Sequence, residues 1–155
     1  MIKEGSTAPA FKTHDANGET VSLTDLRGQK VVLYFYPKDD TPGCTKEACS
    51  FRDAFSKFKK QGITILGVSP DSEKSHQKFT AKYKLPFTLL ADTDHSIADA
   101  YGVYGEKKFM GRTYMGIHRT TFLIDEKGKI KKVFEKVKPE DHADEVLGAF
   151  SGVSQ

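Results

Sequence analysis

Apolar runs and stretches of helical periodicity alternate along the chain, which predicts an α/β fold. β-branched and aromatic residues fill residues 30–36 and 63–68, as in buried strands. Between these runs we predict one helix over residues 42–60, ended by Gly62. Its apolar face is the stripe of Ala48, Phe51, Phe55 and Phe58. This order of elements is typical of a βαβ unit.

Shorter patterns flank this unit. Residues 12–21 predict a hairpin, with Asn17-Gly18 supplying the positive φ angles of its turn, and residues 24–28 predict a connecting turn. No internal repeat or linker interrupts the sequence.

After the unit, three further elements are expected before residue 102. A helix capped by residues 69–71 should run to about residue 83, and residues 87–91 indicate a short strand. Residues 94–101 predict a short helix that Gly102 stops.

The last third of the chain begins with its least regular stretch. Glycines break up residues 106–116, a candidate wall over the cysteine-bearing loop. Strands are predicted at residues 117–124 and 129–137, joined by a hairpin turn at residues 125–128. Pro139 opens a final helix, whose shared apolar face holds Ala143, Val146, Leu147 and Phe150.

Composition limits the function classes. The chain of 155 residues is long enough to form one domain, residues 1–155, with a sizeable core. Its 24 basic and 21 acidic residues are interspersed, and the basic run at residues 127–138 alternates with apolar residues like a strand face, so no nucleic-acid partner is indicated. No apolar stretch approaches the ~20 residues of a membrane span. Without an evident targeting segment, we expect a cytoplasmic protein.

Both cysteines lie where the first apolar strand meets the helix. Thr41 is a suitable N-cap and Pro42 fits the first turn, which places Cys44 in that turn too. Free backbone N–H groups and the helix dipole favour a thiolate there, so Cys44 is a candidate nucleophile. The alternative is that Cys44 is simply a small buried apolar residue.

Cys49 poses a geometric conflict. On an ideal helix its Cα would lie ~8.6 Å from that of Cys44. A disulfide tolerates no more than ~7 Å between Cα atoms. If the two cysteines bond, the first turns of the helix must unwind. Pro42, Gly43 and Thr45 are poor helix formers, so this opening is expected to be easy.

The pattern Pro37-x-x-x-Thr41-x-x-Cys44 resembles the active-site motif of the peroxiredoxins. A second cysteine five positions later resembles the bacterioferritin-comigratory, or Q-type, branch. Residues 8–11, 67–69 and 119–125 also resemble the family at corresponding places, so nearly the whole chain is covered. The resemblance implies a thioredoxin-like fold, with a central mixed sheet flanked by helices and an N-terminal β-hairpin extension.

The resemblance also implies roles for individual residues. Cys44 would attack the peroxide and become a sulfenic acid, and Cys49 would resolve it as an intramolecular disulfide. Arg119 would stabilise the thiolate and donate to the peroxide, Thr41 would bind the peroxide, and Pro37 would shield the sulfur. Thioredoxin or a similar dithiol protein would reduce the disulfide. Such a mechanism needs no cofactor or metal, and it permits a monomer.

Each assignment has an ordinary structural alternative. Thr41 could only cap the helix, Pro37 only end the strand, and Arg119 only face solvent. His118, adjacent to Arg119 on the predicted strand, should point to the opposite side and receives no role.

Other functions remain open at the level of sequence. A thioredoxin-like disulfide exchanger without peroxidase activity usually carries Cys-x-x-Cys, whereas four residues separate these cysteines. A non-enzymatic binding or holdase module is a second alternative. A metal site built from Cys44, Cys49 and a histidine is a third, although no second cysteine pair or His-x-His motif accompanies it.

Overall fold

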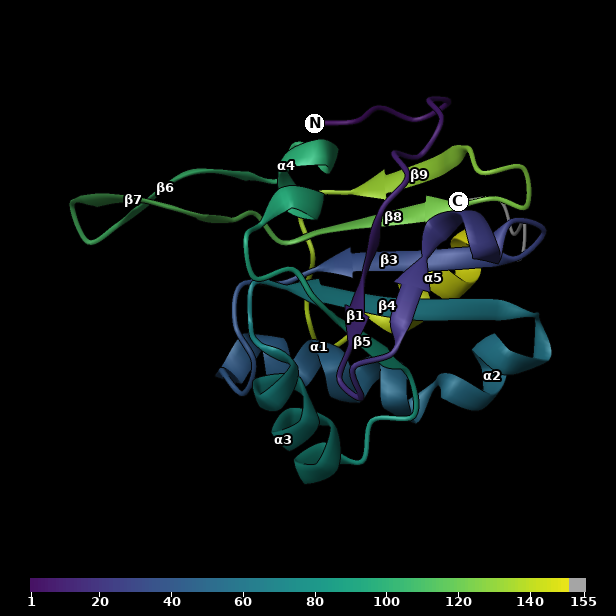
Figure 1. Cartoon of the computed structure of the whole chain (residues 1–155), viewed down its shortest axis with the longest axis horizontal. Helices are drawn as coiled ribbons and strands as arrows, with labels where there is room; N and C mark the ends of the chain where they lie inside the picture. The colour runs from purple at the N-terminus through teal and green to yellow at the C-terminus, as the bar shows by residue number, and fades with distance from the viewer. Residues whose placement is uncertain (151–155) are drawn as a thin grey trace.

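The computed structural model describes residues 1–150, so residues 151–155 of the predicted domain lie outside the described part. A seven-stranded mixed sheet forms the centre of the protein (Figure 1). The strand order is β2 (Thr20–Ser22), β1 (Lys12–Asp15), β5 (Thr88–Ala91), β4 (Ile63–Ser69), β3 (Lys30–Phe35), β8 (Thr120–Ile124) and β9 (Ile130–Phe134). β5, β4 and β3 run parallel, and the other pairs are antiparallel.

The predicted βαβ unit is present, but its helix is divided. It consists of α1 (Pro42–Asp53) and α2 (Phe55–Lys60), separated at Ala54, where φ is −98° and ψ is 4°. The Ala54 N–H still bonds to Ser50 O, so the backbone turns without a large gap in the hydrogen bonds. Ala54, Phe51 and Phe58 are all buried, and this break keeps both aromatic rings in the core.

Alternate side chains of β3 supply two cores on opposite faces of the sheet. Val32 and Tyr34, with Tyr36 just beyond the strand, lie in the core beneath α1, α2, α3 (Glu73–Tyr83) and α5 (His142–Phe150). Val31, Leu33 and Phe35 face α4 (Ser96–Tyr101) and the N-terminal segment. Because both faces are covered, β3 is apolar from Val31 to Phe35, as predicted from its sequence.

The N-terminal hairpin extends the sheet at the β5 edge, as expected. Its turn differs from the prediction, because Gly18 has a positive φ of 77° but Asn17 does not. The Asp15 carboxylate accepts the N–H groups of Asn17 and Glu19 and so shapes the turn. The turn before β9 repeats this pattern around Asp125, with Gly128 at a φ of 79°. The predicted connecting turn at residues 24–28 overlaps the 3₁₀ helix η1 (Leu23–Leu26).

The expectation of an irregular stretch at residues 106–116 is wrong. β6 (Tyr104–Phe109) and β7 (Arg112–Ile117) form a regular two-stranded hairpin that projects from the body at the left of Figure 1. Met110 and Gly111 have φ values of 51° and 77°, so they turn the chain tightly in the left-handed region. The glycines that looked like breaks are therefore part of a hairpin.

Several boundaries also shift. The N-cap of α3 is Ser72, whose hydroxyl accepts the Ser75 N–H, rather than a cap within residues 69–71. β8 begins at Thr120 and α5 at His142, both later than predicted. Among residues 1–150, no helix has both the length and the apolar character needed to cross a bilayer.

Candidate active site

Cys44 lies in the first turn of α1, as predicted from the sequence. Its side chain is 2% exposed, and the first backbone bond of the helix runs from Thr45 N to Thr41 O. The N–H groups of Gly43 and Cys44 therefore precede the helical ladder, at the positive end of the helix dipole. Both cysteines are free thiols in this structure.

Arg119 reaches Cys44 from the segment that joins the β6–β7 hairpin to β8. Its Nη2 donates to Cys44 Sγ at 3.1 Å, and its Nη1 donates to Glu47 Oε1 at 2.5 Å. A Cβ at Gly43 would lie 3.3 Å from Nη2, so glycine leaves room for the guanidinium. Burial acts to lower the pKa of Arg119, but Glu47 and Cys44 raise it overall. The structure thus brings together two predicted residues that lie far apart in sequence.

Glu47 is a residue of this site that the sequence interpretation missed. It is fully buried on α1, and its Oε2 has no hydrogen-bond partner among residues 1–150. Burial raises the pKa of Glu47 to about 7, against the opposing effect of Arg119. Helical spacing was the available indication, because Glu47 follows Cys44 by three positions and so shares its face.

Thr41 and Pro37 lie in the loop between β3 and α1, both half-buried. Thr41 is the N-cap residue, but its hydroxyl donates to Lys38 O at 2.9 Å. The Thr41 hydroxyl accepts no backbone N–H of α1, so it does not cap the helix in the way that its N-cap position suggested. Pro37 lies two residues beyond the end of β3, after Tyr36, and none of the peptide bonds within residues 1–150 is cis.

Cys49 is in the same helix as Cys44 and is partly exposed. The apolar positions Ala48 and Phe51 on either side of it are buried, so Cys49 lies off the apolar stripe, as predicted. One α-helix thus holds both thiols, and an ideal helix keeps their Cα atoms ~8.6 Å apart. The structure shows the closed arrangement in which the two sulfurs are not bonded.

The base of the β6–β7 hairpin borders the site. Lys107 Nζ donates to Ile117 O at 2.8 Å. Burial and the nearby Arg119 lower the pKa of Lys107, whereas Cys44 opposes this change. His118 Nε2 is 3.0 Å from Glu106 O. His118 and Arg119 lie between β7 and β8 rather than on a strand, so their predicted strand alternation does not apply.

These contacts define a possible chemistry. A buried sulfur at a helix N-terminus, with a guanidinium donating to it, is the environment that favours a thiolate nucleophile. A guanidinium carries five N–H donors, so Arg119 can also donate to a small molecule that approaches the sulfur. The site contains no arrangement of the two cysteines with a histidine that would hold a metal within residues 1–150.

A family model and the sequences of known proteins match most of this chain. The AhpC/TSA family model matches residues 5–133. A putative peroxiredoxin bcp from Coxiella burnetii is 56% identical, with 95% of this chain and 97% of the relative covered. Peroxiredoxin Bcp from Escherichia coli strain K12 is 51% identical, with 94% of each chain covered.

Solved structures agree with the sequences. A cysteine-to-serine mutant of PrxQ from Xylella fastidiosa is 35% identical with a TM-score of 0.92, covering 97% of this chain and 96% of that one. The bacterioferritin comigratory protein of Xanthomonas campestris, which has alkyl peroxide reduction activity, is 40% identical with a TM-score of 0.86, covering 91% and 90%. These neighbours confirm the predicted thioredoxin-like fold. The chain therefore belongs to the AhpC/TSA family, in its peroxiredoxin Bcp and PrxQ branch.

Proposed function

We propose that Cys44 is the peroxidatic residue through which this chain reduces peroxides. Membership in the family makes the chain a thiol peroxidase, an oxidoreductase with an antioxidant function. The observation that carries the residue assignment is the 3.1 Å contact from Arg119 Nη2 to Cys44 Sγ. It supports Cys44 as the sulfur that is held ready as a nucleophile.

The proposed reaction has two steps within one chain. The Cys44 thiolate attacks one peroxide oxygen, the O–O bond breaks, and the other oxygen leaves with a proton as water or an alcohol. The resulting Cys44 sulfenic acid then condenses with the Cys49 thiol, which releases water and forms the disulfide. A dithiol protein reduces this disulfide through a mixed-disulfide intermediate and becomes oxidised itself.

Three other residues are assigned to the first step. Arg119 donates hydrogen bonds to the sulfur and to the peroxide as charge develops on its oxygens. The Thr41 hydroxyl, now bonded within the loop to Lys38 O, binds the peroxide when it enters. Pro37 restricts the loop and shields the sulfur.

The proposed partners follow from this chemistry. Hydrogen peroxide and organic hydroperoxides are the substrates, and the alkyl peroxide activity of the Xanthomonas campestris relative supports the organic class. Thioredoxin or a similar dithiol protein is the reductant. Both redox steps use the thiols of one chain, so the proposed enzyme acts as a monomer and requires no cofactor or metal. We place it in the cytoplasm, and we assign it no nucleic-acid or membrane partner.

Two cysteine variants test the assignment. Cys44→Ser should abolish peroxide consumption, whereas Cys49→Ser should allow one round of Cys44 oxidation and then stop. Mass spectrometry of the peroxide-treated wild-type protein should show an internal disulfide between the two cysteines. Full turnover with thioredoxin in the Cys49 variant, or only intermolecular disulfides in the wild type, would contradict the mechanism. Disulfide exchange without peroxide consumption would favour the thioredoxin-like alternative.

A further inference from the structure

A buried polar network ties the active-site loop to α3. Asp39 lies in this loop and is 7% exposed. Its Oδ1 accepts the Tyr36 hydroxyl at 2.6 Å, and its Oδ2 accepts the Ser75 hydroxyl at 2.8 Å. The same Oδ2 is 2.7 Å from Nδ1 of the fully buried His76. One carboxylate therefore has three side-chain partners, two of them on α3.

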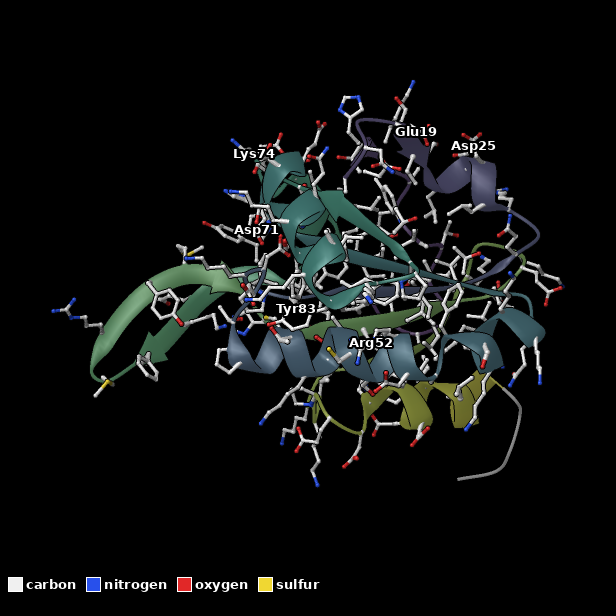
Figure 2. All side chains as sticks on the ribbon, turned by 90° about the horizontal axis from the view of Figure 1, so that it is seen from below. Glu19, Asp25, Arg52, Asp71, Lys74 and Tyr83 are labelled. Carbon is white, nitrogen blue, oxygen red and sulfur yellow. The ribbon has the colours of Figure 1, made fainter. Side chains whose placement is uncertain are left out.

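The backbone of Asp39 is held as well. Its N–H donates to Asp71 Oδ2 at 2.8 Å, and the same oxygen accepts the Ser69 hydroxyl at 2.6 Å. Ser69 ends β4, and Asp71 lies in the turn before α3, as its label in Figure 2 shows. The main chain and the side chain of Asp39 are thus both anchored to the β4–α3 connection.

The hydrogen bonds also locate a ring proton of His76. Leu90 O can only accept, so the ring nitrogen Nε2, 2.9 Å away, carries a hydrogen. The other ring nitrogen, Nδ1, forms a second hydrogen bond with Asp39 Oδ2 at 2.7 Å. Because a buried polar group without a partner is costly, His76 and Asp39 depend on each other.

A metal ion is the competing explanation for this cluster. Ligand atoms of Asp39, Asp71 and His76 lie within 4.8 Å of one another. However, hydrogen bonds to protein groups already engage a carboxylate oxygen of each aspartate and both nitrogens of His76. The network therefore accounts for the arrangement without an ion.

We propose that the Asp39–His76 pair is a positioning anchor, which keeps the loop at residues 36–41 in place while α1 unwinds. This inference rests on the proposed function, because disulfide formation between Cys44 and Cys49 is what requires α1 to open. The anchor ends two residues before Thr41, the N-cap of α1. Unwinding would start beyond this point, and the reduced helix would reform against an unmoved loop.

Asp39→Asn, with Asp40→Asn as a matched control, tests the anchor. Asp40 lies in the same loop, but its exposed carboxylate binds Lys82 Nζ at 2.8 Å and the Tyr83 hydroxyl at 2.9 Å. Stopped-flow measurement separates oxidation of Cys44 by hydrogen peroxide from the later formation of the disulfide. We expect Asp39→Asn to slow the first step at least about tenfold, because a displaced loop misplaces the reacting groups. Disulfide formation should not be slowed.

The control should change both steps by less than about twofold, as is typical for an exposed ion pair. Hydrogen exchange of the amides at residues 37–41 should rise in Asp39→Asn and stay unchanged in Asp40→Asn. Equal effects of the two variants, or wild-type oxidation of Cys44 in Asp39→Asn, would overturn the anchor. If the wild-type protein itself fails to react with peroxide, the proposed function fails instead.

Two further measurements keep the inference testable if Asp39→Asn does not fold. Tyr36→Phe removes a single hydroxyl from the network and should slow the first step selectively, though by less. Metal analysis of the purified wild-type protein should find no ion bound at His76. A Tyr36→Phe protein with wild-type kinetics would contradict the anchor, as would a stoichiometric metal ion lost on His76→Gln.

Discussion

At the scale of single residues, Arg119 links two acidic groups of α1. One terminal nitrogen contacts the Cys44 sulfur and the other contacts Glu47. A role for Arg119 was predicted from the sequence. Its orientation depends on the carboxylate of Glu47, for which the sequence predicted no role. Because the guanidinium is planar, fixing one nitrogen on Glu47 fixes the direction of the other. Glu47 is thus a positioning residue for the sulfur contact.

Glu47→Gln should change the pH dependence of peroxide reduction. The pKa of Glu47 is raised to about 7, so above this pH the carboxylate is ionised and holds Arg119 most strongly. We expect the variant to react with peroxide about 10- to 100-fold more slowly at pH 8, the effect of one charge-assisted hydrogen bond. At pH 6 the difference should shrink, because Glu47 of the wild type is then mostly protonated. Stopped-flow rates between these values test this.

Glu106→Gln is a suitable control, since Glu106 is exposed on the hairpin, where it pairs with Met115 across the two strands. It should leave the pH profile unchanged. A constant ratio of wild-type to Glu47→Gln rates from pH 6 to pH 8 would refute the positioning role.

At the scale of elements, α1 has two conflicting requirements. Its folded first turn places Cys44, yet the same helix separates Cys44 from Cys49. Two contacts further along hold the helix. Arg52 donates to Tyr83 O at 2.9 Å, and both residues are labelled in Figure 2. Ser50 Oγ accepts the Ala143 N–H of α5. Opening of α1 is therefore expected to stop before or at these contacts.

Ser50→Ala should speed formation of the disulfide. Ser50 directly follows Cys49, and its bond to Ala143 N at 3.2 Å restrains the part of α1 that must move. Loss of one such bond is worth about 0.5–1.5 kcal/mol. The corresponding acceleration is about 2- to 10-fold. Quenched-flow sampling with mass spectrometry measures this step directly.

Ser56→Ala serves as the control, because Ser56 is exposed on α2 and lies outside the opening segment. Unchanged disulfide formation in Ser50→Ala would show that unwinding ends before residue 50.

At the scale of the whole molecule, α5 closes the core over α1 through a buried histidine. His142 Nε2 is 2.7 Å from Thr121 Oγ1 of β8, and its ring packs edge-on against Phe51 and Phe134. Burial lowers the pKa of His142, although Glu145, 2.9 Å from Nδ1, partly opposes this. The histidine therefore links the protonation state of the protein to its global stability.

The sign of this linkage follows from the direction of the shift. An unfolded histidine has a pKa of about 6.5, above that of folded His142, so the unfolded chain binds more protons as the pH falls. The stabilising contribution is present above about pH 6.5 and is lost below it, by at most about 1.4 kcal/mol per pH unit. Urea unfolding of the wild type and His142→Gln between pH 8 and pH 5 should show the difference narrowing with acidity. His118→Gln, at an exposed histidine, is the control for loss of a histidine at the surface.

Local patterns predicted much of the fold because each depends on neighbours in sequence. The apolar run of β3, the stripe of α1, the turn glycines and Cys44 at a helix start all depend on short-range spacing. The β6–β7 hairpin was not recognised, because its glycines and exposed side chains resemble a loop and its two strands pair only with each other. The break at Ala54 was also missed, since packing of Phe51 and Phe58 decides it.

The sequence by itself determined that both thiols lie on one helix, with Cys44 in its first turn, and it predicted the conflict in distance between them, because helical geometry follows from a few adjacent residues. Only the tertiary structure decided what surrounds them. Glu47 becomes a partner of Arg119, and Asp39 a partner of His76, only when separate elements fold together. Buried polar groups need partners but do not specify them locally, so chain topology selects which partner each group finds.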